Sequence, residues 1–488
     1  MHIEDLNLDI LAVIFEFCAD NTETRLAYPS PHNHLGWTRL AGVNRRWRGL
    51  LLAMPRLWGL VVSYAPSKTM FDIYLSRSRN APIVLYYPPW VNYNGTTIFP
   101  IKSIDHDLVP RAQTLIDHGY AEHNRLIFTG RTLPLLQFFR TANCQDPDHP
   151  LVAPSLLHLH SSGIQLSIQA PNLRILYIEY SRDDRERLVG LPAALAAYPC
   201  LEEVTIEPDA YYKRLDWRDL HLDIRAGIAN LDRGQLPVQM PRLQTFTISA
   251  SALYLAFFWR SVVLSHTATV QFTASGGYVA DNVELLSAIQ TRLSSPLCDT
   301  LSIAAHSRVK FEDRRGEWQV TKVVLSRGTE SDSIGSCTVA FVDDTGHSAF
   351  TSAVLLHSGP VGEYLRTLVL DFDTRRNSVP PLASYFEGAY ASIETLKLRG
   401  TASTLGDFLD VYELPHLQTL VFDCRDQYDA REMECLLRQL RSRQSKLRRL
   451  VLRGETTFTD EAQLKGEIGT LRLNKAAEVV EDERTWVV

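Results

Sequence analysis

Pro171-Asn-Leu173-Arg-Ile-Leu176-Tyr-Ile178 is the stretch of sequence that decides the fold. A proline opens this phrase, a leucine follows at its third position, and apolar residues stand at its sixth and eighth positions. The alternation at its end has the two-residue period of a β-strand with one buried face. We therefore expect a short strand that buries Leu176 and Ile178 and leaves the residues between them on the opposite face.

The phrase recurs along the chain. Further copies begin at Pro199, Pro241, Leu365, Ile393, Leu417 and Leu447, and weaker ones near Leu136, Leu156 and Cys298. Helix-like stretches such as 405–412 and 429–442 stand between copies. One strand and one helix per unit is the signature of leucine-rich repeats, which stack into a solenoid with the strands along one concave face. We therefore expect an α/β protein with an irregular, leucine-rich-repeat-like horseshoe over residues 131–475.

The centre of this region departs from the repeat. Between 201 and 365 the phrases drift apart, and strand-like runs without the full phrase occur at 269–273, 320–325 and 338–342. Degenerate repeats with long insertions are one interpretation. An independent central β unit is the alternative, and both remain open for residues 250–360.

The first sixty residues have helical periodicity instead. One helical face carries Ile10, Leu11, Ile14, Phe15 and Cys18. Residues 21–33 contain two prolines and several polar residues, which is typical of a loop. Helical spacing resumes at Leu40 and continues to Met54, where Pro55 is expected to end the helix. Short helices with this much apolar surface need the rest of the chain or a partner to cover it.

Composition limits the class of protein. The chain has 488 residues, of which 45% are hydrophobic and 22% charged, as in folded proteins of more than one ordinary domain. Its net charge of −6 provides no general attraction for nucleic acid or acidic membranes. The seven cysteines have no CxxC or zinc spacing, and neither a signal peptide nor a membrane-spanning run is found. We expect a protein of the cytoplasm, the nucleus or both.

Catalytic and cofactor fingerprints are absent from the sequence. Asp344-Thr-Gly346 matches one half of an aspartic-protease site, but no second copy exists, so a turn between strands is the better interpretation. His158 and His160 would share one strand face without a third metal ligand. The basic run 438–453 is interpreted as a solvated helix that leads into the last strand, and 476–488 as an acidic tail. We expect no catalytic residue, metal or cofactor.

The N-terminal residues resemble the F-box, in the form common among fungal F-box proteins. The matching residues are Leu6, Asp9, Ile10, Leu11, Ile14 and Phe15, then Val43-Asn-Arg-Arg-Trp47 with Leu50, then Pro55-Arg-Leu-Trp58, and then Ser78-Arg-Asn-Ala-Pro82-Ile-Val-Leu85. The resemblance implies a three-helix F-box over residues 1–63, followed by a linker helix and a transition into the solenoid over 64–130. Two features depart from the family: Asn7 replaces a proline, and the loop before Val43 is longer than usual.

F-box proteins are adaptors of Skp-cullin-F-box ubiquitin ligases, so the resemblance implies a Skp adaptor as partner and, through it, a cullin. The candidate Skp-binding residues are Leu6, Ile10, Leu11, Ile14, Val43 and Leu50. Each of these could equally belong to the core of the helices, whereas Trp47, Leu51, Met54 and Trp58 are assigned to that core. An interface of this kind needs apolar anchors and few central charges.

A target protein would bind the concave strand face, on the residues between the buried ones. The candidates are Tyr177, Glu179, Glu203 and Glu207 in early repeats, and Asp371, Lys397, Arg399, Asp423, Arg449 and Arg453 in later ones. This order predicts a face that changes from acidic to mixed and then to basic, which would select a charged target. For any single residue, a solvated strand position is the simpler interpretation.

Three functions can be weighed. The first is a substrate-recognition adaptor of a ubiquitin ligase, not itself an enzyme, that binds neither nucleic acid nor membrane. The second is a free-standing leucine-rich-repeat scaffold or binding protein outside ubiquitination, which the Asn7 departure keeps open. The third is a hydrolase in the central region, for which no motif is present.

Overall fold

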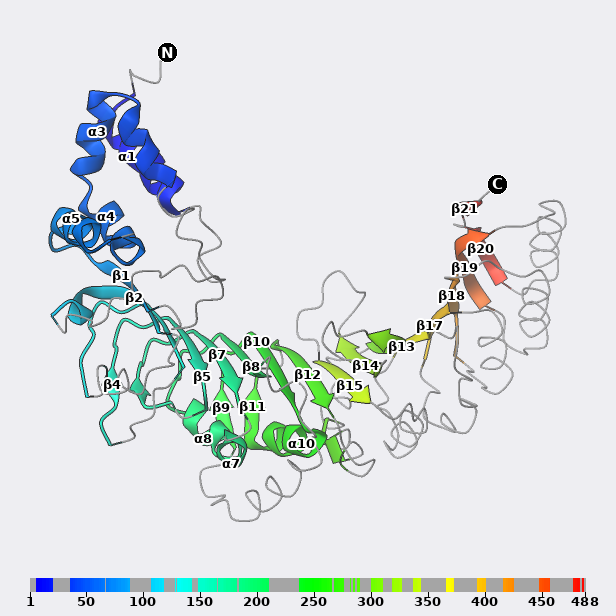
Figure 1. Ribbon diagram of the computed structural model, residues 1–488. Helices are drawn as coiled ribbons and strands as arrows, with labels where there is room; N and C mark the ends of the chain where they lie inside the picture. Colours follow the sequence, from blue (N-terminus) through cyan, green and yellow to red (C-terminus); the bar gives the residue numbers. More distant parts are fainter. Residues whose placement is uncertain are drawn as a thin grey trace. The chain divides into compact units, whose positions relative to one another are not determined.

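The protein was analysed as a computed structural model (Figure 1). The structure describes residues 6–20, 36–65, 67–87, 107–117, 128, 130–142, 148–164, 166–181, 184–209, 237–265, 267–275, 281, 284–285, 288–289, 300–309, 318–326, 337–343, 366–372, 393–400, 416–424, 447–456, 477–482 and 485–486. The chain folds into two compact units. The first comprises Met1–Ser181 with Ala194–Glu202, and the second comprises Arg182–Ala193 with Glu203–Val488. Both are built around parallel strands, so the protein is α/β as expected.

Helices form the start of the first unit. They are α1 (Leu8–Asp20), the 3-10 helix η3 (Gly36–Gly42), α3 (Arg45–Leu52), α4 (Pro55–Val61), the 3-10 turn η4 (Val62–Tyr64) and α5 (Lys68–Ser78). Asn44 begins α3 because its side chain accepts a hydrogen bond from the Trp47 amide. The expected helix end before Pro55 is confirmed, and Pro55 itself opens α4, where a missing N–H costs nothing. The predicted loop 21–33 lies outside the described residues.

Aromatic side chains hold these helices together. Phe15 of α1 and Trp47 of α3 are both buried and meet edge to face with ring centroids 5.2 Å apart. Trp58 of α4 donates its indole N–H to the Leu51 carbonyl over 2.9 Å and packs against Tyr74 of α5. The assignment of Trp47, Leu51 and Trp58 to the core is therefore confirmed.

The sheet of the first unit begins earlier than expected. It consists of β1 (Ile83–Tyr87), β2 (Ala112–Asp117), β3 (Phe138–Thr141), β5 (His158–Ser162) and β7 (Ile175–Tyr180). The strands are parallel and adjacent in that order. The turn η5 (Val109–Arg111) leads into β2, and β4 (Leu151–Val152) pairs with β6 (Ile168–Gln169) in a separate two-stranded ladder. The segment 64–130, predicted as a linker helix and a transition into the solenoid, contains helix α5 and also supplies two strands of the sheet.

The helices join the sheet at β1. The Ser63 hydroxyl donates to the Val84 carbonyl over 2.8 Å and accepts from the Tyr86 amide over 3.0 Å, as a neighbouring strand would. Arg111 ties the end of α5 to β2 by donating to the Ser78 hydroxyl and the Ala81 carbonyl. The two Ser63 bonds occupy backbone groups of β1 that no described strand pairs. The Ser78–Leu85 phrase therefore forms the connection between helix α5 and the sheet.

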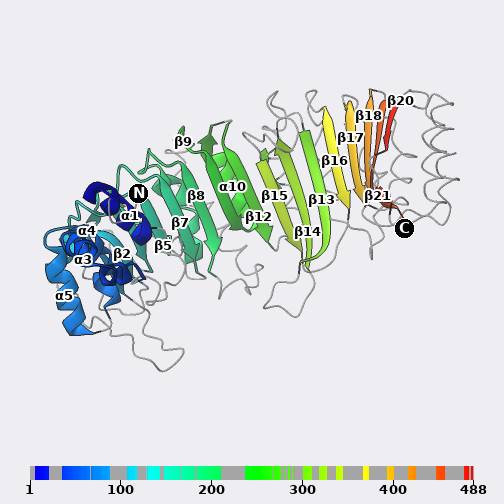
Figure 2. The same ribbon diagram turned by 90° about the horizontal axis from the view of Figure 1, so that it is seen from above.

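The second unit contains a longer ladder of strands (Figure 2). In spatial order these are β8 (Glu203–Pro208), β10 (Thr245–Ala250), β12 (Thr269–Ser275), β15 (Cys337–Asp343), β14 (Trp318–Ser326), β13 (Thr300–Val309), β16 (Thr367–Phe372), β17 (Thr395–Gly400), β18 (Thr419–Cys424), β19 (Leu447–Thr456) and β20 (Ala477–Asp482). The short strands β9 (Val238–Met240) and β11 (Val262–Leu264) pair with each other, and β21 (Thr485–Trp486) pairs with the end of β19. The short helices α7 (Arg185–Leu188) and α8 (Leu191–Leu195) come between β7 and β8 in the sequence. Every full copy of the phrase therefore marks a strand, as predicted.

Helix α10 (Ala252–Ser261) follows β10 and confirms the interpretation of its aromatic run as a packed helix. Phe258 is buried and stacks on Phe246 of β10, with ring centroids 5.0 Å apart. The buried Tyr254 hydroxyl donates to the Leu188 carbonyl over 2.8 Å. The two other predicted helices, 405–412 and 429–442, lie outside the described residues.

The central region continues the ladder of the second unit through two reversals of strand direction. Strands β13, β14 and β15 are successively antiparallel, yet β15 is parallel to β12 and β13 is parallel to β16. Two reversals restore the original direction, so these three strands continue the same ladder. The region is therefore not an independent β unit, and degenerate repeats with long insertions stay a prediction for it.

The predicted acidic tail is wrong for the described part of 476–488. Residues 477–482 form β20, which pairs in parallel with β19, and Ala477 is buried. Arg449 of β19 donates two hydrogen bonds to the Glu481 carboxylate, over 3.1 Å and 2.6 Å. The acidic residues of this segment therefore stand on a strand, where one of them has an arginine partner.

Candidate interaction surfaces

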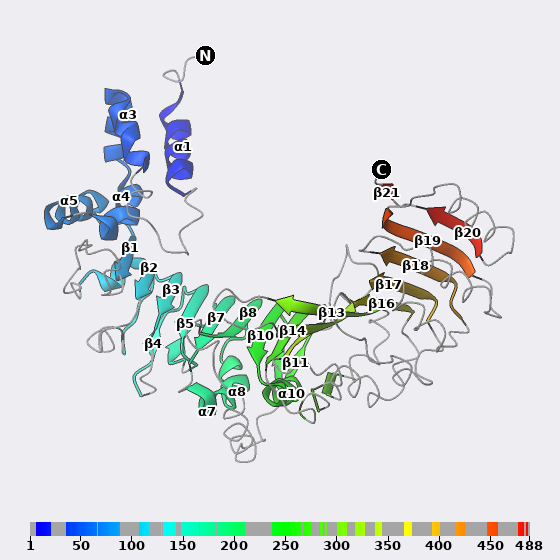
Figure 3. The same cartoon turned by 45° about the vertical axis from the view of Figure 1, so that its right-hand side comes forward.

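Large apolar side chains are exposed on the N-terminal helices. Helix α1 stands beside α3 (Figure 3) and packs Leu11, Phe15 and Ala19 inward. Its opposite side carries Ile10, Val13 and Phe17, which are 51%, 65% and 64% exposed. Spacings of three and four residues place these three on one stripe of the helix. We call them the α1 stripe.

Val43, which lies between η3 and α3, is also exposed, at 55%. The α1 stripe itself contains no charged residue, but two acidic residues flank it, Asp9 four residues before Val13 and Glu16 three residues after it. Contiguous exposed apolar residues are characteristic of surfaces that bind another macromolecule. The helices therefore bury one apolar layer among themselves and leave a second one uncovered.

The six candidate Skp-binding residues do not share one environment. Ile10 and Val43 are exposed, and Leu6, Ile14 and Leu50 are half-buried. Leu11 is completely buried, so it packs in the interior of the helices and is not available to a partner in this arrangement. Outside these six, Met54 is half-buried, and Cys18, expected on the inner face of α1, is exposed.

Sequence reasoning missed Val13 and Phe17. The signal was present, because α1 is apolar on nearly all sides (LDILAVIFEFCAD), and a helix of that kind is covered on all sides when it is fully packed. A second stripe could have been read from the spacing of Ile10, Val13 and Phe17.

Asn7 has a structural role at the start of α1. Its side-chain oxygen accepts a hydrogen bond from the Asp9 amide over 3.2 Å, and its carbonyl accepts one from the Leu11 amide over 3.0 Å. Arg46 of α3 donates to the neighbouring Leu6 carbonyl over 2.6 Å. Asn7 is therefore a helix cap, a position that favours asparagine.

The strands present a second surface. In β7 the residues alternate between half-buried and buried, with Tyr177 and Glu179 on the more exposed side and Leu176 and Ile178 buried. We call the side that carries Tyr177 and its equivalents the open face. In the second unit, Glu203 is exposed and Glu207 half-buried on the corresponding side of β8. The predicted alternation is confirmed.

The later candidate residues can be placed by strand register. Strand register places Asp371 next to Arg399, Arg399 next to Asp423, and Asp423 next to Arg453. Arg449 has a carboxylate partner in Glu481. The change from acidic to mixed and then to basic along the face stays a prediction. Of the other late candidates, Lys397 is half-buried between Val369 and Val421 in register.

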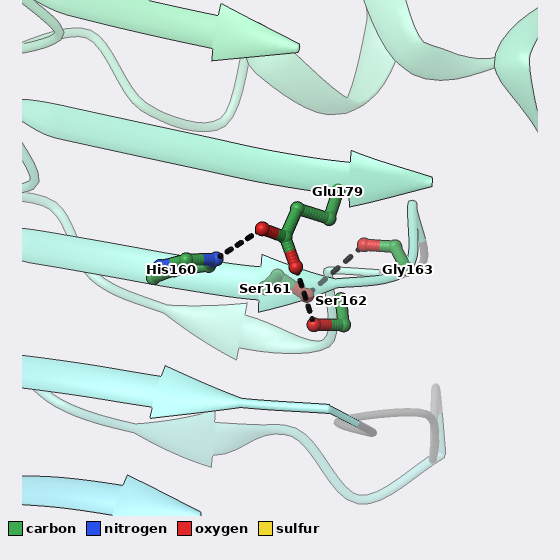
Figure 4. Close-up of polar contacts among 5 residues, drawn as sticks. All are labelled: His160, Ser161, Ser162, Gly163 and Glu179. Carbon is green, nitrogen blue, oxygen red and sulfur yellow. Dashed lines mark hydrogen bonds and ion pairs between the residues drawn. The ribbon is translucent and has the colours of Figure 1, made fainter. Parts of the chain in front are cut away.

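On the open face of the first unit, side chains from the neighbouring strands β5 and β7 converge (Figure 4). The His160 Nε2 atom of β5 lies 3.5 Å from Oε1 of Glu179 on β7, and the Ser162 hydroxyl donates to Oε2 over 3.4 Å. The Nε2 distance is long for a hydrogen bond, so the attraction is mainly electrostatic and strongest when His160 is protonated. We call this group, together with Arg140 of β3 and Tyr177 of β7, the β5–β7 cluster.

Strand register explains the cluster. Arg140 is in register with His160, which is in register with Tyr177, and Ser162 is in register with Glu179. The His160 and Tyr177 rings meet edge to face with centroids 4.3 Å apart. The pKa of Glu179 is lowered, chiefly by the contact from His160 and further by Arg140 and Ser162, while burial opposes this shift. Glu179 is therefore a carboxylate held in place by its neighbours.

Within the described residues, no group of three or more His, Cys, Asp or Glu side chains could hold a metal ion. His158 lies on the open face next to Phe138, with ring centroids 6.3 Å apart. Among the described helices, none is both long enough and apolar enough to cross a membrane.

No protein-family model matches the chain, and no curated protein matches it in sequence. We therefore argue the function from the two surfaces, the α1 stripe with Val43 and the open face with the β5–β7 cluster.

Proposed function

We propose that this chain is a target-recognition adaptor of a Skp-cullin-F-box ubiquitin ligase. The N-terminal helices would act as an F-box that binds a Skp adaptor and, through it, a cullin. The strands that follow, proposed as an irregular leucine-rich-repeat solenoid, would bind the target protein. The chain would contribute no catalytic group, since an adaptor acts by raising the effective concentration of a target near the conjugating enzyme.

The observation that carries the proposal is the exposed apolar α1 stripe above a packed aromatic core. Phe17 and Val13 are exposed while Phe15 and Trp47 close the interior behind them, so the stripe is surplus to the packing of the helices. Burying an apolar side chain of this size contributes about 1.5–3 kcal/mol, and a few such anchors dominate an interface. A helical partner that lays apolar side chains across α1 and Val43 fits this surface.

The test is co-purification of the full-length chain with a Skp adaptor. We expect Ile10→Asp with Val43→Asp to abolish binding, because each change places an unpaired charge in an apolar interface. Ile73→Asp on α5 is the matched control, since Ile73 is also an exposed apolar helix residue but lies outside the stripe. All three positions are exposed, so circular dichroism should show that each variant is folded.

Loss of binding in the double variant and retention in the control would support the adaptor function. A folded wild-type chain that does not bind any Skp adaptor tested would overturn it and favour the second candidate, a scaffold outside ubiquitination. One observation favours that candidate: Asn7 stands where the F-box has a proline, and it caps α1.

A further inference from the structure

We propose that the arginines around Val43 form a docking surface for an acidic patch on the protein that covers the α1 stripe. They are Arg39 of η3 with Arg45 and Arg48 of α3, and we call them the Val43 arginines. The inference rests on the proposed function, in which that protein is a Skp adaptor, and adds that carboxylates of the adaptor meet these arginines.

Positive charge is concentrated in the segment that contains this surface. Residues 36–79 include eight arginine and lysine residues and one acidic residue, Asp72, in a chain whose net charge is −6. That single carboxylate already has a partner nearby, since the Lys68 ammonium lies 3.9 Å from it. The segment therefore carries a surplus of positive charge that no acidic residue of its own can neutralise.

The Val43 arginines are exposed. Neither Arg39 nor Arg45 has a hydrogen bond or an ion pair among the described contacts. Arg48 donates through its Nε atom to the Ala41 carbonyl over 3.0 Å, which ties α3 to η3, and its terminal nitrogens have no described partner. These guanidinium groups are therefore available to a partner, and a guanidinium can bind a carboxylate through two parallel N–H donors.

The arginines stand beside the apolar part of the proposed Skp site. Helix α1 packs against both η3 and α3, the two elements that carry them. Val43 is 55% exposed and lies four residues after Arg39 and two residues before Arg45. A partner that buries Val43 would bring its own side chains within reach of the arginines. Charged residues around apolar anchors are the usual arrangement at the rim of an interface.

The neighbouring charges favour a protein over a nucleic acid or an anionic membrane. Asp9 and Glu16 are exposed on α1, which packs against α3. A continuous polyanion on the arginines would also meet these carboxylates, whereas a protein can place acidic residues opposite the arginines alone. The exposed Val43 side chain likewise fits an apolar side chain and not a phosphate group.

The experiment measures the association and dissociation rates of the full-length chain with a Skp adaptor by surface plasmon resonance, at about 0.05 M and about 0.5 M salt. We expect Arg39→Gln with Arg45→Gln to slow association roughly tenfold at low salt, because charges at an interface rim act mainly on the rate of encounter. Dissociation should change little, and the difference from wild type should shrink at high salt. Arg39→Lys with Arg45→Lys keeps both charges and should restore most of the association rate.

The matched control is Lys68→Gln with Arg79→Gln. It removes the same charge from exposed positions of α5 and its C-terminal cap, and α5 packs against α4 and η4. Slower association in the Arg39 and Arg45 double variant, with wild-type rates in the control, would support the inference. Equal slowing in both double variants would overturn it, because net charge alone would then be the cause. A slowing that does not depend on salt would overturn it as well.

A second measurement uses fluorescence anisotropy and needs no Skp adaptor. Its probes are a fluorescein-labelled poly-glutamate peptide and a labelled duplex DNA at low salt. We expect poly-glutamate to bind the wild type and the α5 control more tightly than the Arg39→Gln, Arg45→Gln variant. Tighter binding of the DNA than of poly-glutamate would overturn the inference, since the occupant would then be a nucleic acid.

The two measurements together separate this inference from the proposed function. Skp binding whose rates are the same in wild type and in the Arg39→Gln, Arg45→Gln variant would overturn the inference and leave the adaptor function standing. Poly-glutamate binding that depends on these arginines, in a folded chain that binds no Skp adaptor, would overturn the adaptor function and leave an acidic protein of another kind as the partner. A folded chain that binds neither would overturn both.

Discussion

At the scale of single residues, Gly59 shows how tightly the helices meet the sheet. A Cβ atom at this position would lie 2.2 Å from the Pro82 carbonyl oxygen, a distance at which something must move. We expect Gly59→Ala to lower the free energy of unfolding by about 1–3 kcal/mol. Gly49→Ala is the control, because Gly49 is inside α3 with nothing within 4 Å of its Cβ position. That change should stabilise by up to about 1 kcal/mol. Urea denaturation measures both, and equal effects would contradict the close approach.

Glu179 gives a prediction about pH at the same scale. Its pKa is lowered below the ordinary value of 4.5 by His160, Arg140 and Ser162, so its contribution to stability is present above that value. The contribution is lost as the pH falls through the lowered pKa. Glu179→Gln should therefore be less stable than wild type at pH 7, and the difference should shrink at acidic pH. Urea denaturation at pH 7 and below pH 4.5 measures it, and a difference that grows toward acid would refute the assigned cause.

At the scale of elements, β20 makes the C-terminal segment part of the sheet and not a frayed tail. A chain that lacks residues 477–488 would lose the pairing along β19 and the Arg449–Glu481 bonds. We expect this deletion to lower the melting temperature and to expose the edge of β19 to association, because an unpaired strand edge is a template for pairing. A frayed tail could be removed without effect. Differential scanning calorimetry and light scattering distinguish the two results, and the substitution Glu478→Gln, at an exposed position of β20, is the control.

The sequence predicts the position and the buried face of some strands, but not the direction of a strand or its pairing partner. Where apolar residues alternate regularly, as in 175–180 or 245–250, period alone located the strand and its buried face. Period carries no direction, however, so the reversal at β14 was hidden. In 477–482 the acidic residues suggested a disordered tail, although this segment forms a strand by pairing with β19. At the corner of helix and sheet, Ser63 takes the place of a strand by two hydrogen bonds, which no local pattern encodes.

The candidate sites could be predicted only as far as a pattern within one element carries. Tyr177 and Glu179 could be placed on the open face because alternation within one strand suffices. The cluster they belong to could not, since Arg140 and Ser162 reach them through strand register across three elements. Likewise, Ile10 and Val43 follow from a motif, whereas the exposure of Phe17 depends on which side of α1 the other helices cover.

At the scale of the whole molecule, an adaptor must hold two partners at once. The α1 stripe and the β5–β7 cluster share no residue and no hydrogen bond among the described contacts, so their binding free energies should add. We expect Ile10→Asp with Val43→Asp to leave target binding at the open face unchanged, and Arg140→Gln to leave Skp binding unchanged. Titrating each partner in the presence of the other, by isothermal calorimetry, should give affinities within about twofold of the separate values. A stronger coupling would mean that one partner alters the surface that the other binds. Binding of the target would then depend on whether the Skp adaptor is bound, and the chain would act as a switch instead of a passive link.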